Sequence, residues 1–196
     1  MRIGIYGGSF NPVHNGHVHL ANELLCAAEL DRLIIIPSNI SPQKDTNGGI
    51  EPMHRINMCR IAFDNPLIEV SDCEIKRGGK SYTFDTINYI KSIYQNSEIY
   101  LFMGSDMLLS FHTWFRYTDL LELCTICAIS RGSEGYYNEL CSYNEEKLSG
   151  KARIFDIAPI EISSTVVRNA VANGQDISRM VPIGVAEYIK EHRLYG

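Results

Sequence analysis

The sequence has no apolar run close to the roughly 20 residues that a membrane-spanning helix needs. It also lacks the G-x-G-x-x-G turn of dinucleotide-binding proteins and the G-K-[ST] ending of a P-loop. Positive charge is not in excess, since 18 Lys and Arg against 23 Asp and Glu give a formal net charge of −5. We therefore expect no membrane partner and no nucleic-acid partner, and any phosphate site must depend on a few local cations.

Cysteine is present but is not arranged for disulfides or zinc. The chain has six cysteines and begins with a core-like strand rather than a signal peptide, so we expect reduced thiols and a cytoplasmic location. Cys124 and Cys127 form a C-x-x-C, but no second pair has the spacing of a zinc ribbon. The surrounding stretch is apolar and β-like, which predicts buried structural thiols.

Strands and helices alternate along the whole chain, and its length of 196 residues fits one domain, residues 1–196. Strands are expected at Arg2–Tyr6, Leu33–Pro37, Ile68–Cys73, Ile99–Met103, Thr125–Ser130 and Arg153–Ile157. Helices are expected at Asn15–Leu30 and Met53–Phe63, from Ser81, from Met107, and at Trp114–Leu123, Tyr136–Leu148, Ser164–Asn173 and Pro182–His192. Several strands are apolar on both faces, which predicts a three-layer, Rossmann-like α/β fold with a doubly wound parallel sheet and helices on both faces.

In such folds ligands bind outside the carboxyl ends of the strands. Three polar segments fall at predicted strand ends: Gly7–His17, Gly104–Asp106 and Ile162–Arg168. A long polar loop, Asn39–Pro52, follows another strand, and its length is typical of a functional loop.

The segment G-G-S-F-N-P-V-H-N-G-H, residues Gly7 to His17, joins a strand to a helix. Its glycines let backbone N–H groups approach an anion closely, and the following helix start adds partial positive charge. His14 and His17 are three positions apart, so both side chains can point at one phosphate chain. The segment predicts a phosphate-binding loop of a type distinct from the P-loop.

The segment I-S-S-T-V-V-R begins a later helix, with Ser163 or Ser164 as its N-cap. The helix start offers free N–H groups to an anion, and Arg168 lies one turn further as a fork-shaped donor. Gly104-Ser105-Asp106 follows a buried strand, where the carboxylate can bind ribose hydroxyls or hold Mg²⁺ through water, or simply cap a helix. The sequence leaves these alternatives open.

The two segments together resemble the two signatures of the H-x-G-H nucleotidyltransferase superfamily, in the same order along the chain. Intermediate landmarks extend the resemblance over nearly the whole chain, to the bacterial nicotinate mononucleotide adenylyltransferases. This resemblance implies transfer of the adenylyl group of ATP to nicotinate mononucleotide, with Mg²⁺, in NAD biosynthesis. The products would be nicotinate adenine dinucleotide and pyrophosphate.

The resemblance also implies roles for individual residues, with the helices from about residue 164 completing the ATP site. The catalytic candidates are His14, His17, Lys44, Ser164 and Arg168. The ATP-binding candidates are Gly7, Gly8, Ser9, Phe10, Gly104, Asp106, Ile162 and Ser163. Two positions depart from the family pattern: Asn11 stands where an aspartate is frequent, and Gln43 stands where a histidine is common.

The segment S-Y-T-F-D-T, residues 81–86, resembles the family segment that binds the pyridine nucleotide. The resemblance implies that the backbone N–H of Thr83 binds the nicotinate carboxylate and that Trp114 stacks on the pyridine ring. Phe115 stands where a tyrosine is common and would act through its backbone N–H. An indole face against a planar, electron-poor ring is physically reasonable.

Other functions stay open at this stage. Another acceptor could replace nicotinate mononucleotide: nicotinamide mononucleotide, phosphopantetheine or flavin mononucleotide. Phosphopantetheine enzymes usually have threonine at the position of His14. A nucleotide-binding regulator without catalysis and an NAD-dependent oxidoreductase share the gross architecture. A homo-oligomer is compatible with the sequence.

Overall fold

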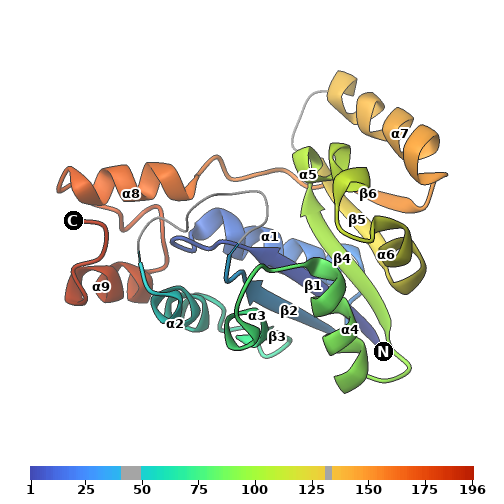
Figure 1. Cartoon of the computed structure of the whole chain (residues 1–196). Coiled ribbons are helices and arrows are strands. Elements are labelled where there is room, and N and C mark those ends of the chain that lie inside the picture. The colour runs from blue at the N-terminus through green and yellow to red at the C-terminus, as the bar shows by residue number, and fades with distance from the viewer. Residues whose placement is uncertain (41–49, 131–133) are drawn as a thin grey trace.

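Six parallel strands form one sheet at the centre of the structure, a computed structural model that describes residues 1–40, 50–130 and 134–196 (Figure 1). The strands are β1 (Arg2–Gly8), β2 (Arg32–Pro37), β3 (Ile68–Val70), β4 (Glu98–Gly104), β5 (Thr125–Ser130) and β6 (Ala152–Asp156). Their order is β3-β2-β1-β4-β5-β6, and each neighbouring pair is parallel. The order runs outward in both directions from β1 and β4, so the prediction of a doubly wound, Rossmann-like sheet is confirmed.

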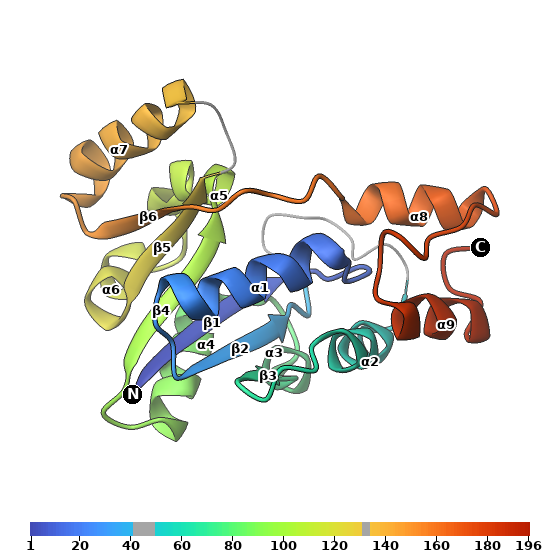
Figure 2. The same cartoon turned by 180° about the vertical axis from the view of Figure 1, so that it is seen from behind.

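Helices cover both faces of the sheet (Figure 2). On one face lie α1 (Asn15–Ala27), α2 (Pro52–Ala62), α8 (Ser164–Ala172) and α9 (Ile183–Glu191). On the other lie α3 (Cys73–Arg77), α4 (Thr83–Ile93), α5 (Ser105–Leu109), the 3-10 turn η1 (Phe111–Thr113), α6 (Tyr117–Leu123) and α7 (Glu134–Leu148). Two hydrophobic cores result, one on each side of the sheet.

Alternate side chains of each strand enter opposite cores. In β4, Ile99 and Leu101 pack under α3–α7, whereas Tyr100 and Phe102 pack under α1, α2, α8 and α9. Successive strand residues point to opposite faces, so a strand buried on both faces requires a continuous apolar run. This explains why the strand sequences show little alternation of polar and apolar residues.

Several predicted elements have other limits in the structure, and in two of them the local cause is clear. The strand predicted at Ile68–Cys73 ends at Val70, because Cys73–Arg77 forms the short helix α3. Glu74 in its first turn and Lys76 in its last turn match the helix dipole. The helix predicted from Trp114 begins at Tyr117, because Arg116 has a φ of 57°, a left-handed conformation that a right-handed helix does not continue through.

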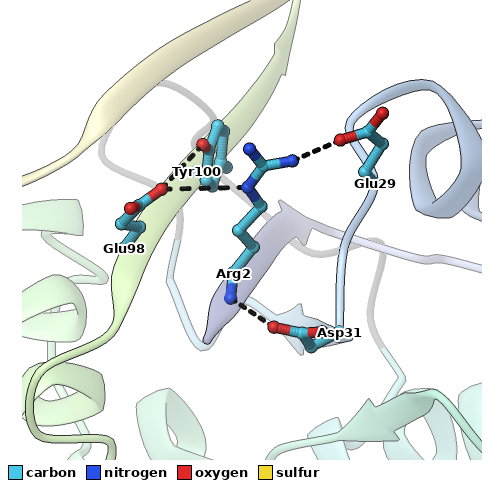
Figure 3. A network of polar contacts seen from close by, with 5 residues as sticks. All are labelled: Arg2, Glu29, Asp31, Glu98 and Tyr100. Atoms are coloured by element: carbon cyan, nitrogen blue, oxygen red, sulfur yellow. Dashed lines mark hydrogen bonds and ion pairs between the residues drawn. The ribbon is translucent and has the colours of Figure 1, made fainter.

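At the amino ends of the strands, a polar network joins Arg2 of β1 to the residues just before β2 and to the start of β4 (Figure 3). Asp31 accepts a 2.7 Å hydrogen bond from the backbone N–H of Arg2, and the Arg2 guanidinium pairs with Glu29. Arg2 Nε lies 3.9 Å from Glu98, whose carboxylate also accepts from the Tyr100 hydroxyl at 3.1 Å. The ion-paired side chains of Arg2, Glu29 and Glu98 are partly or largely exposed, so these pairs set the geometry of this end more than they add stability.

Two sequence expectations concern the loop after β2 and the absence of a membrane-spanning helix. Lys44 and Gln43 belong to residues 41–49 and lie outside the described residues. In the part of the chain that the structure describes, no helix combines the length and the apolar character that crossing a bilayer requires.

Cys124 and Cys127 have the environment of structural thiols. Cys127 is buried and Cys124 is partly buried, and burial raises the pKa of each thiol to about 12. Because the thiolate is the reactive form, we expect iodoacetamide at about pH 8 to alkylate the exposed Cys26 and to leave both thiols unmodified. Peptide mass mapping of the folded protein checks this, and rapid labelling of Cys127 would contradict it.

Candidate active site

A cavity of about 590 Å³ lies at the carboxyl ends of the strands, where a doubly wound sheet binds its ligands. It is lined by the loop after β1, the first turns of α1, the end of β5, the segment after β6 and the start of α8. Of the residues singled out in the sequence, Ser9, Asn11, His14, His17, Ile162, Ser163, Ser164 and Arg168 line it. The two segments predicted to bind phosphate therefore face one cavity from opposite ends of the chain.

His14 and His17 lie side by side at the start of α1. His14 is the N-cap residue, and its ring centroid is 3.7 Å from that of His17. The backbone N–H of His14 donates to Nδ1 of His17 at 3.2 Å. Nδ1 is thus an acceptor, so the neutral His17 ring carries its proton on Nε2. The ring of Phe10 packs 4.9 Å from that of His17 and fixes its plane.

Gly16 lies between the His14 ring and the backbone of the segment after β6, where there is little space for a side chain. A Cβ added there would lie 3.1 Å from the Ile160 carbonyl oxygen and 3.1 Å from Nδ1 of His14. Nearby, Nε2 of His19 lies 3.0 Å from the carbonyl oxygen of Ala158. Glycine at this position therefore lets the segment after β6 approach α1 closely enough to close the cavity.

Helix α8 begins at the cavity and holds the loop after β1. Ser163 is its N-cap, and its hydroxyl oxygen accepts from the backbone N–H of Val166 at 3.2 Å. Arg168 Nη1 donates to the Asn11 carbonyl oxygen at 2.7 Å, and the Ser164 hydroxyl donates to the carbonyl oxygen of Pro12 at 2.8 Å. The start of α8, with its free N–H groups, is thereby fixed against the loop.

Asn11 stands where the sequence resemblance implies an aspartate, and the structure shows what its side chain does. Its Oδ1 accepts a 2.6 Å hydrogen bond from the hydroxyl of Tyr195. An amide oxygen accepts this bond as well as a carboxylate would, without placing a negative charge beside the cavity. The substitution therefore keeps the loop anchored and makes the site less repulsive to anions.

Gly104 and Asp106 lie at the carboxyl end of β4, beside β1 in the sheet. Gly104 is the N-cap of α5, and a Cβ on it would come within 2.6 Å of Oδ1 of Asp106. Neither residue lines the cavity, and Gly7, Gly8 and Phe10 do not line it either. Phe10 is only 1% exposed, because its ring packs in the core.

The residues predicted to bind the acceptor form a second cluster, on the opposite face of the sheet. Thr83 is the first residue of α4, and the rings of its neighbours Tyr82 and Phe84 lie 4.9 Å and 6.3 Å from the ring of Phe115. Trp114 is partly buried against Phe111, at a centroid distance of 5.3 Å. The fold thus brings the start of α4 and residues 114–115 together, although about thirty positions separate them.

Several lining residues lie outside the segments that the sequence analysis singled out: Tyr6, His19, Leu20, Ile129 and the segment 157–160. Ile129 was accessible to prediction, because β5 neighbours β4 and its carboxyl end meets the same edge of the sheet. The segment 157–160 carries no motif, and its place depends on the close approach to Gly16.

Comparison with known proteins defines the class. A family model described as cytidylyltransferase-like matches residues 5–170, so the chain has the nucleotidyltransferase domain of that class. A relative from Oceanobacillus iheyensis named "Probable nicotinate-nucleotide adenylyltransferase" is 38% identical over 196 residues, 99% of this chain and 96% of its own length. A relative of the same name from Carboxydothermus hydrogenoformans is 37% identical, over 99% of this chain and 98% of its own length. The chain belongs to the nicotinate-nucleotide adenylyltransferase family.

Solved structures confirm the fold. The structure of Plasmodium falciparum nicotinic acid mononucleotide adenylyltransferase complexed with NaAD superimposes with a TM-score of 0.76 at 21% identity. The alignment covers 99% of this chain and 97% of that chain. The Rossmann-like architecture is therefore shared over the full length.

Proposed function

We propose that the chain transfers the adenylyl group of ATP to nicotinate mononucleotide, giving nicotinate adenine dinucleotide and pyrophosphate in NAD biosynthesis. The observation that carries this proposal is the single cavity that His14, His17 and the start of α8 share. The family membership of the chain and the names of its relatives support the same reaction.

The reaction exchanges one phosphorus–oxygen bond for another. An oxygen of the acceptor's 5′-phosphate attacks the α-phosphorus of ATP, and the bond from that phosphorus to the bridging oxygen of the β-phosphate breaks. The electron pair of the broken bond leaves with pyrophosphate. The nucleophile is already an anion, so the protein needs to align two reactants and neutralise charge on the phosphates rather than remove a proton.

The cavity residues fit these tasks. His17 would donate from Nε2 to the α-phosphate, since its Nδ1 is engaged by the His14 backbone, and His14 would donate to the phosphate chain. The start of α8, with Ser164 and Arg168, would bind phosphate oxygens. Lys44 would add a further point charge, and Mg²⁺ would enter on the phosphates of ATP.

The rest of ATP would contact the backbone of Gly7, Gly8, Ser9 and Phe10. It would also contact Gly104 and Asp106, and Ile162 and Ser163 would lie on the adenosine side. On the acceptor, the N–H of Thr83 and that of Phe115 would bind the carboxylate, and Trp114 would stack on the ring. N–H donors favour a carboxylate over an amide, because an amide would turn its own N–H₂ toward them.

The six unpaired cysteines support a cytoplasmic location, where thiols stay reduced. In the described residues no group of three or more His, Cys, Asp and Glu side chains is arranged to hold a metal ion. We treat Mg²⁺ as part of the ATP substrate, bound mainly through its phosphates.

Pyrophosphate release from MgATP tests the proposal, with nicotinate mononucleotide and nicotinamide mononucleotide as parallel acceptors. We expect rapid release with the nicotinate acceptor and at least about tenfold lower kcat/KM with the amide, since mispaired donors are costly. Preference for the amide would overturn the assigned acceptor site. No release with either would overturn the reaction.

A further inference from the structure

Arg55 of α2 is the largest of the fully buried side chains, at 0% exposure. Its Nε and Nη2 have no hydrogen-bond partner among the described residues, and no ion pair in residues 1–40, 50–130 and 134–196 includes it. Guanidinium groups remain charged in proteins. Within the described part of the chain, the core therefore holds a cation that has no ion-pair partner.

The neighbouring ionisable groups do not neutralise this charge. Burial lowers the pKa of the Arg55 guanidinium, and Cys59, Tyr195 and Glu74 oppose this only in part. Burial also raises the pKa of Cys59 and that of Tyr195 above their usual ranges, so both are uncharged at neutral pH. Glu74 forms no ion pair with Arg55 in the described residues and accepts from the Thr86 hydroxyl at 2.6 Å, so its charge offsets that of Arg55 only in part. An uncompensated buried cation opposes folding, and such a residue calls for a functional explanation.

Among the residues that the structure describes, Arg55 makes one hydrogen bond, to the loop beside the cavity. Nη1 donates to the carbonyl oxygen of Ser9 at 2.8 Å, and the preceding carbonyl, that of Gly8, accepts from the backbone N–H of Ser38 at 2.9 Å. In a trans peptide the C=O and the following N–H point in opposite directions. Holding the Ser9 carbonyl toward Arg55 therefore turns the N–H of Phe10 away from it. Phe10 itself has a φ of 46°, an uncommon conformation that needs such support.

We propose that Arg55 is a positioning residue for the triphosphate of ATP, and this inference rests on the ATP site of the proposed function. It orients the Ser9–Phe10 peptide and places a permanent positive charge behind the loop. The negative charge that offsets it arrives with the nucleotide's phosphates. In this arrangement the cation lowers the stability of the nucleotide-free protein and strengthens phosphate binding.

The test compares three variants by calorimetric binding of ATP and of adenosine, and by steady-state kinetics. Arg55→Gln keeps an N–H donor and removes the charge, Arg55→Lys keeps the charge without the fork, and Arg60→Gln is the control. Arg60 is on the same helix, half-exposed and 3.6 Å from Asp72, so its substitution removes one positive charge away from the loop. We expect Arg55→Gln to raise the KM for ATP about tenfold with kcat within about threefold, because the interaction is the same in ground and transition states.

Adenosine affinity should stay unchanged in all three variants, because adenosine carries no phosphate. A merely structural role would lower the active fraction, and hence kcat per protein, with the KM for ATP unchanged, which overturns the proposal. Should Arg55→Gln fail to fold, Arg55→Lys decides: a roughly threefold rise in the KM for ATP supports the role and no rise overturns it. Wild-type protein that binds ATP but releases no pyrophosphate contradicts the proposed reaction alone, since the comparison of ATP with adenosine still judges Arg55.

Discussion

Replacing His17 by alanine is expected to lower kcat about 10²–10³-fold, the usual effect of removing one donor to a transition-state oxyanion. The structure leaves Nε2 of this ring as the proton-bearing nitrogen, because Nδ1 accepts from the backbone N–H of His14. The lost donor would face the α-phosphate, where negative charge develops. The fold should persist, since His17 is only partly buried and lies in the first turn of α1.

Two further substitutions at this position separate the functions of its two nitrogens. His17→Asn places an acceptor near the position of Nδ1 but no donor near Nε2, whereas His17→Gln places a donor near Nε2. We expect the glutamine variant to retain more turnover than the asparagine variant. His192→Ala, an exposed histidine at the end of α9, serves as the control. Near-normal kcat in folded His17→Ala, with circular dichroism matching the wild type, would remove His17 from the reaction.

Gly16→Ala is expected to lower kcat/KM about 100-fold while the helix remains intact, since displacing reacting groups by about 1 Å costs on this order. The added Cβ would lie 3.1 Å from both the Ile160 carbonyl oxygen and the His14 ring. Because the first contact is with backbone and the second is with a residue of the site, relieving either contact requires a shift of groups that line the cavity. Alanine is by itself a better helix former than glycine, so a general loss of helix is not expected.

Gly184→Ala is the matched control for this prediction, because Gly184 is also the second residue of a helix. Its added Cβ meets only the Cγ2 methyl of Ile61, at 2.8 Å, and the Ile61 side chain is 40% exposed and has room to move. We expect unchanged kcat/KM in this variant. Equal losses in both variants would attribute the effect of Gly16→Ala to helix distortion rather than to the cavity.

The sheet was predictable because its strands are buried on both faces and carry continuous apolar runs. The meeting of the two signature segments was predictable for a related reason, since both follow strands of one parallel sheet. The limits of short elements were not: α3 has five residues, too few to show a helical period. Likewise, nothing in the sequence around Trp114 indicates the left-handed conformation of Arg116 that delays α6.

Features that depend on tertiary packing could not be predicted from the sequence either. Arg55 reads as an ordinary polar residue on a helix, and only the structure shows that it is fully buried beneath Ser9. The segment 157–160 has no chemical motif, and it lines the cavity because Gly16 allows its carbonyl groups to come close. The burial of Arg55 and the position of segment 157–160 both depend on steric fit between segments that are distant in the sequence, and this fit cannot be predicted from composition.

The hydrogen bond from Tyr195 to Asn11 joins positions 184 residues apart. The central sheet does not depend on it, since its ladders are formed by β1–β6 alone. A local opening that detaches the segment around Tyr195 would therefore free one anchor of the loop while the sheet stays folded. The nucleotide site then has its own opening equilibrium, with a smaller free energy than global unfolding, and a bound nucleotide would draw that equilibrium toward the closed form by mass action. We therefore expect the segment around Tyr195 and the loop at Asn11 to open together, so that amide exchange in α9 would slow when a nucleotide occupies the cavity.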